Sequence, residues 1–148
     1  MNDRAFSQGQ DGVWWPVAGR SMWPLAAPME VRLRPLAQPT AIGTVVAVLA
    51  LDAQQAPQVV LHRVVRIDPE SFILQGDTTG RPDAPVPWSA VVGELAAVRL
   101  GPLVLPWPTG PGPGAQHWRR AGLLWLRVAP QLRQGLRRAV RKVATSKT

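Results

Sequence analysis

Four residues of this chain, Ser21, His62, Asp77 and Asp83, are of types that together could carry out nucleophilic chemistry. Ser21 lies in VAGRSMWPLAAP, between the turn-forming residues Gly19 and Pro24. A serine hydroxyl is a weak nucleophile at neutral pH and needs an adjacent base. The chain has no lysine before Lys142, and its other histidine, His117, lies in the linker region, so the candidate base is His62, in VVLHRVVRI. The types of these residues would suit acyl transfer.

Such a site also needs an acid that orients the imidazole and stabilises its charged form. Two acids, Asp77 and Asp83, lie in the stretch GDTTGRPDAPVP that follows the histidine segment. Each residue alone also fits a structural role, since turns often hold serine and aspartate, and apolar strands often pack a histidine. Composition and spacing therefore indicate a small β domain that could be a hydrolase.

The elements that must position these residues are mostly strands. Residues 13–100 read as a β-rich body, because short runs alternate apolar and polar residues or are rich in β-branched residues. The expected strands are 29–36 (half-buried), 44–51 (fully buried), 58–67, 71–75 and 90–100, with a turn at 52–57 that joins two of them in a hairpin. Residues 76–87 hold too much Gly, Pro and Asp for regular structure, so we expect a loop there.

A basic tail follows the body. Residues 101–116 are rich in Pro and Gly and predict a linker, and the tail 117–148 is expected to be a helix as far as residue 144, broken or kinked near Pro130. Apolar residues recur there at helical spacing: Leu132, Leu136, Val140 and Val143. Residues 1–100 hold eight arginines against nine acids, whereas residues 101–148 hold nine Lys and Arg and no acid. The net charge of +8 thus belongs to the tail.

Composition excludes several classes of site. The chain has no cysteine, so disulfides, thiol nucleophiles and thiolate metal sites are ruled out. It has two histidines, which disfavours a multi-histidine metal site, and we expect neither a metal nor a cofactor. The first twelve residues are polar and the longest apolar run, 45–51, is too short to span a bilayer. We therefore expect a cytoplasmic protein, either soluble or peripherally bound to a membrane.

Three segments, taken together, resemble a known family. VAGRSMWPL, VVLHRVV and ILQGDTTGRPDAPVP…VVGEL are similar, in order and spacing, to the catalytic core of type I signal peptidases. The wider clan of these enzymes also holds the LexA-like self-cleaving repressors. The His-Arg-Val sequence at His62 fits the endoplasmic-reticulum, archaeal and sporulation-type branch, where histidine replaces the lysine of the bacterial enzymes. The resemblance covers about residues 14–100 and implies the small β fold of that clan.

The resemblance also implies roles for individual residues. It makes Ser21 the nucleophile, with its backbone N–H in the oxyanion hole, His62 the general base and Asp83 the orienting acid. The remaining motif residues would structure the loop (Gly76 and Asp77) or support the motif (Gly19, Met22, Pro24 and Arg63). Many relatives have a serine at the position of Gly19, so one oxyanion donor is absent here or replaced, a loss that typically costs about 10²–10³ in rate.

The expected activity is a serine endopeptidase whose peptide or protein substrate binds as an extended strand. Two alternatives stay open: a non-catalytic peptide-binding or scaffold module on the same fold, and a LexA-like self-processing regulator. The polar residues before Ser21 differ from the apolar span that usually precedes the nucleophile in this branch. For the tail, residues 118–143 could pack on the body, meet a second copy or another partner, or bind an anionic membrane surface. No nucleic-acid partner is expected, since no recognisable binding motif is present.

Overall fold

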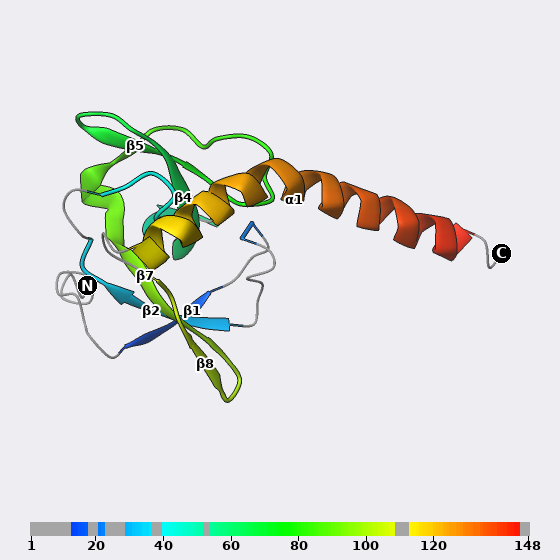
Figure 1. The fold of residues 1–148 in the computed structure, drawn as a ribbon, viewed down its shortest axis with the longest axis horizontal. Helices are drawn as coiled ribbons and strands as arrows, with labels where there is room; N and C mark the ends of the chain where they lie inside the picture. Colours follow the sequence, from blue (N-terminus) through cyan, green and yellow to red (C-terminus); the bar gives the residue numbers. More distant parts are fainter. Residues whose placement is uncertain are drawn as a thin grey trace.

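The computed structural model describes residues 13–17, 21–22, 29–36, 40–51, 54–108 and 113–145. These residues form one antiparallel sheet of eight strands, a short 3₁₀ turn and one C-terminal helix (Figure 1). The elements are β1 (Trp14–Val17), β2 (Met29–Arg34), β3 (Val45–Leu51), β4 (Pro57–Ile67), β5 (Ser71–Gln75), β6 (Val86–Pro87), η1 (Trp88–Ala90), β7 (Val91–Leu100), β8 (Leu103–Pro106) and α1 (Pro113–Thr145). The mainly β fold with a C-terminal helix is as expected.

The strand order places the middle of the chain at the middle of the sheet. The hydrogen-bonded order is β1-β2-β7-β3-β4-β5-β6, and β8 pairs with β7 outside this path. The β3–β4 and β4–β5 neighbours are sequential hairpins, whereas β7 returns from later in the chain to lie between β2 and β3. The long strand β4 therefore has partners on both sides and is a rigid support for the residues that it carries.

The sheet buries apolar side chains on both faces. Successive residues of a strand point to opposite faces. Along β3, Val45 and Ala47 accordingly belong to one buried cluster, and Val46 and Val48 to a second. The first cluster also contains Met22, Met29, Val31, Leu33, Leu61, Leu95 and Val98, and the second contains Val64, Phe72 and Leu74. The apolar run expected to be fully buried is buried at its start, but Leu49 and Leu51 at its end are 40% and 59% exposed.

The five expected strands are present with small shifts at their ends, and three strands are additional. β1 and β6 are short, and β8 lies inside the segment 101–116 that the sequence predicted as a linker. That prediction was wrong for Leu103–Pro106, because Gly101, at a φ of +58°, allows a tight turn that folds this apolar run back onto β7. α1 also begins inside the predicted linker, at Pro113, since proline suits the first position of a helix.

Helix α1 continues through Pro130 without a break. Figure 1 shows that its axis changes direction in its orange middle part and that its second half extends away from the sheet. The bend, rather than a break, is the expected result of one missing N–H and one ring clash in a helix that is otherwise hydrogen-bonded. Within the described residues, no helix is both long enough and apolar enough to cross a membrane.

The first half of α1 packs on the body through small residues. Ala115, Gly122 and Ala129, spaced seven apart on one helix face, are its buried residues among those whose side chains are described. A Cβ added at Gly43 would lie 2.7 Å from Cβ of Arg119, so the helix approaches the loop before β3 at close range. With Gly122 close to the guanidinium of Arg63, these contacts dock the first half of α1 on β4 and on the loop before β3.

Candidate active site

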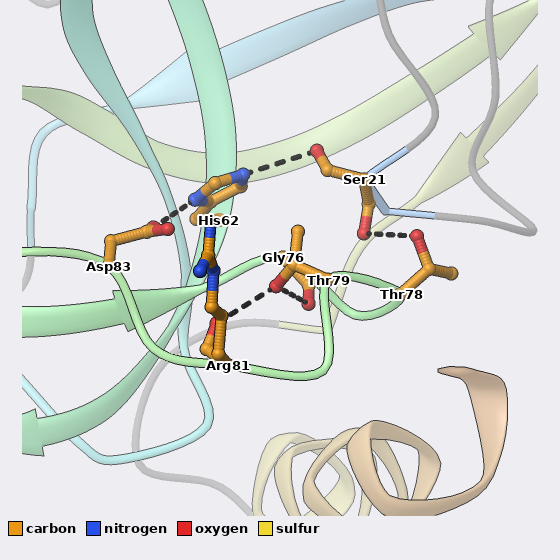
Figure 2. Close-up of polar contacts among 7 residues, drawn as sticks. All are labelled: Ser21, His62, Gly76, Thr78, Thr79, Arg81 and Asp83. Atoms are coloured by element: carbon orange, nitrogen blue, oxygen red, sulfur yellow. Dashed lines mark hydrogen bonds and ion pairs between the residues drawn. The ribbon is translucent and has the colours of Figure 1, made fainter. Parts of the chain in front are cut away.

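Three predicted residues, far apart in the sequence, meet at one place in the structure. Nε2 of His62 lies 3.2 Å from Oγ of Ser21, and Nδ1 of the same ring contacts Oδ2 of Asp83 (Figure 2). When Asp83 is ionised and the His62 ring is neutral, Nδ1–H donates to the carboxylate, which can only accept, and Nε2 accepts the Ser21 hydroxyl proton. This arrangement is the one that the geometry of a Ser-His-Asp site requires.

The sheet holds the histidine of this group in place. His62 lies opposite Val46 in the β3–β4 pairing, and its neighbour Arg63 lies opposite Val45 and Gln75. Because successive residues of a strand point to opposite faces, His62 and Arg63 belong to different faces of the sheet. The His62 side chain is 13% exposed, so the ring is mostly enclosed while one side remains open to the nucleophile.

Two contacts fix the serine. Met22, the next residue, is 3% exposed and belongs to the first apolar cluster, which anchors the chain on one side of Ser21. The carbonyl oxygen of Ser21 accepts the backbone N–H of Thr78 at 2.8 Å and the Thr78 hydroxyl at 3.3 Å. Figure 2 shows Thr78 reaching this carbonyl from the turn that follows β5. The position of the hydroxyl therefore depends on that turn.

The turn is closed by hydrogen bonds to a glycine carbonyl. The backbone N–H and the hydroxyl of Thr79 donate to Gly76 O at 3.0 and 2.9 Å. Further along, the N–H of Asp83 donates to Leu74 O at 2.8 Å, which returns the chain to β5 and brings the carboxylate to His62. A Cβ at Gly76 would lie 2.7 Å from Cβ of Ser21 and 3.0 Å from Nε2 of His62. Glycine is thus required for close approach.

Asp77 has a different partner from Asp83. Its two carboxylate oxygens accept Nε and Nη2 of Arg63 at 2.9 and 2.8 Å, and both side chains are 4% exposed. The remaining Nη1 of Arg63 donates to Gly43 O at 2.9 Å. This bidentate pair connects β4, the loop before β3 and the turn after β5. The observed contacts therefore make Asp77 a residue that braces the loop.

The structure brings together Ser21, His62 and Asp83, as the sequence predicted, and it places Met22, Arg63, Gly76 and Asp77 around them. Gly19 and Pro24 lie outside the described residues. Sequence analysis missed the two threonines of the turn, which hold Ser21 and Gly76. The sequence contained a signal for these two threonines, since hydroxyl side chains directly after Gly-Asp commonly hydrogen-bond to the backbone of a turn.

Within the described residues, no group of three or more His, Asp or Glu side chains is placed to hold a metal ion. The side chains of the site supply a hydroxyl that can lose a proton to an oriented imidazole. Comparisons with protein-family models, with curated proteins and with solved structures found no match for this chain.

Proposed function

We propose that this chain is a serine endopeptidase of the signal-peptidase-like type. The observation that carries the proposal is the placement of His62 between Ser21 and Asp83, with a hydrogen-bond partner at each ring nitrogen. The segments that resemble type I signal peptidases supply these three residues, and the same segments supply the turn that holds the serine. A fold without a hydrolytic role would not need the three side chains to be in contact.

The reaction follows from the direction of these hydrogen bonds. His62 Nε2 takes the proton of Ser21 Oγ as the oxygen bonds to the carbonyl carbon of the substrate. The imidazolium, held by Asp83, then gives this proton to the amide nitrogen as the C–N bond breaks and the amine leaves. A water molecule deprotonated by His62 attacks the acyl-enzyme, and the second product leaves as a carboxylic acid while Ser21 regains its proton.

The substrate would bind as an extended strand that leads to the nucleophile. β1 stands at one end of the strand order, with β2 as its paired strand among the described elements, and it ends four residues before Ser21. A peptide that extends the sheet beside β1 would have its scissile bond carried toward Ser21 by main-chain hydrogen bonds. The resemblance assigns the Ser21 backbone N–H as the donor to the developing oxyanion.

Active-site labelling tests the proposal. A fluorophosphonate probe should label the wild-type protein, because it reacts with a serine hydroxyl activated by a base. Ser21→Ala should abolish labelling, and His62→Ala should reduce its rate by about 10² or more. Ser89→Ala is the matched control, since Ser89 is an exposed serine in η1, and it should label like the wild type.

The same experiment separates the alternatives. A folded wild-type protein that resists the probe would support a non-catalytic peptide-binding module instead. A Ser21→Ala variant that is labelled at the wild-type rate would place the reactive nucleophile at another residue and contradict the assignment of Ser21. A self-processing regulator would react with the probe and would also yield two fragments on storage that the Ser21→Ala variant does not yield.

A further inference from the structure

Helix α1 carries a second apolar face that the body does not cover. Its small residues, Ala115, Gly122 and Ala129, face the sheet and account for the docking of its first half. Leu124, Val128 and Leu132 are spaced by four residues and are 62%, 41% and 46% exposed. Residues four apart lie on one side of a helix, so these three form a continuous stripe, here called the leucine stripe.

More apolar surface adjoins the leucine stripe. A groove of about 420 Å³ runs between α1 and β8, lined on the helix side by Trp118 and Trp125 and on the β8 side by Leu105 and Trp107. Trp107 and Trp118 stack with ring centroids 5.6 Å apart, and Trp118 is still 46% exposed. Tryptophan is the residue type that prefers a boundary between apolar and wet surroundings.

Cationic side chains lie next to this surface. Arg120 precedes Leu124 by four residues and Arg127 follows it by three, so both arginines flank the leucine stripe, and both are exposed. The sequence of α1 holds eight Lys and Arg and no acid. A helix with this many cations and no internal acid has no counter-charge of its own, and its field attracts an anionic surface.

We propose that α1 is an interfacial helix that binds the protein to an anionic lipid bilayer. Leu124, Val128 and Leu132 enter the boundary between headgroups and acyl chains, and the flanking arginines meet the lipid phosphates. A nucleic acid would use the arginines but would leave the leucine stripe in water. A bilayer uses both features, and the charge complementarity selects one that contains anionic lipid. The leucine stripe contains none of the residues placed in or around the candidate active site, so this proposal does not rest on the peptidase activity proposed above.

Sedimentation with vesicles tests the proposal on the full chain. Vesicles of phosphatidylcholine with phosphatidylglycerol should bind the protein in low salt, and pure phosphatidylcholine vesicles should bind it at least tenfold more weakly. Raising the salt should weaken binding, since mobile ions screen exposed charges. The triple variant Leu124→Ser/Val128→Ser/Leu132→Ser should bind at least about tenfold more weakly. Arg120→Gln/Arg127→Gln should lose about fivefold per arginine.

Matched controls come from the sheet. Leu49→Ser/Leu51→Ser removes exposed leucines from β3, and Arg32→Gln/Arg66→Gln removes two exposed arginines from β2 and β4. Both should bind vesicles within about twofold of the wild type, because neither pair lies on α1. Circular dichroism and thermal melting establish that each variant is folded.

Two results would overturn the proposal. One is equal binding of the leucine-stripe variant and the wild type to anionic vesicles, which would mean that the stripe does not enter the bilayer. The other is an absence of vesicle binding together with salt-sensitive binding of a DNA or RNA oligonucleotide that Arg120→Gln/Arg127→Gln weakens, which would make the basic face a nucleic-acid surface.

Discussion

Gly76→Ala should damage the active site through a single added methyl group. The new Cβ would lie 2.7 Å from Cβ of Ser21, 2.8 Å from Cγ2 of Thr79 and 3.0 Å from Nε2 of His62. Carbon atoms in normal contact are about 3.5–4.0 Å apart, so one of these groups has to move by about 1 Å. A misplacement of about 1 Å in a catalytic group costs about 10² in rate.

The labelling rate of Ser21 by a fluorophosphonate measures this loss. We expect Gly76→Ala to label about 10² more slowly than the wild type, with a loss of folding free energy of about 1–3 kcal/mol from overpacking. Gly101→Ala is the control: its φ of +58° makes an added side chain cost about 1 kcal/mol, but nothing lies within 4 Å of the added Cβ. Gly101→Ala should therefore melt at a lower temperature and label normally.

The two glycine variants distinguish a local effect at the site from a general loss of stability. If Gly76→Ala labels at the wild-type rate, the close approach of the turn to the serine and histidine does not control their geometry. If both variants slow labelling equally, the effect follows from lost stability rather than from the contact at Gly76.

Two further pairs of variants test the parts that surround the site. Asp77→Ala should lower the melting temperature by roughly 10 °C, because it leaves the guanidinium of Arg63 buried without its partner, at a cost of about 3–5 kcal/mol. Asp83→Ala, whose side chain is 34% exposed, should melt near the wild type and label at least about 10² more slowly, and the reverse pattern would exchange the two roles. Gly122→Ala should lower the melting temperature, since its Cβ would overlap the guanidinium of Arg63. Gly135→Ala, with nothing within 4 Å of the added Cβ, should raise it slightly through helix propensity, and equal shifts would contradict the docking at Arg63.

The sequence predicted the strands whose pattern is local. Residues 29–34 alternate apolar and charged side chains, which indicates a strand with one buried face. The β-branched run of β3 indicates a strand that is buried on both faces. β8 was not predicted, because glycine and proline dominate the segment around it and indicate a linker. Its proline is tolerated because β8 pairs with β7 outside the main strand order, where proline is acceptable at an edge.

The three residues of the candidate site could be predicted because each lies in a short motif. The choice between the two acids depended on the resemblance, since both lie in the same loop and both could reach an imidazole. The structure gives the physical reason for the difference: Asp77 is held by the two nitrogens of Arg63, and the Leu74–Asp83 hydrogen bond returns the later acid to the histidine. Tertiary contacts decide which partner each aspartate takes, so the spacing of residues in the sequence does not determine it.

The docking of helix α1 is harder to predict from the sequence, because the helix has two apolar faces. One consists of small residues, Ala115, Gly122 and Ala129, and the other of larger ones. The larger residues would ordinarily be assigned to the core, since they would bury more area. Here the buried guanidinium of Arg63 lies directly beneath the helix, so only a glycine can pass over it and the small face must dock. The leucine stripe is exposed as a direct consequence, since one arginine in β4, next to the histidine of the site, decides which face of the helix docks.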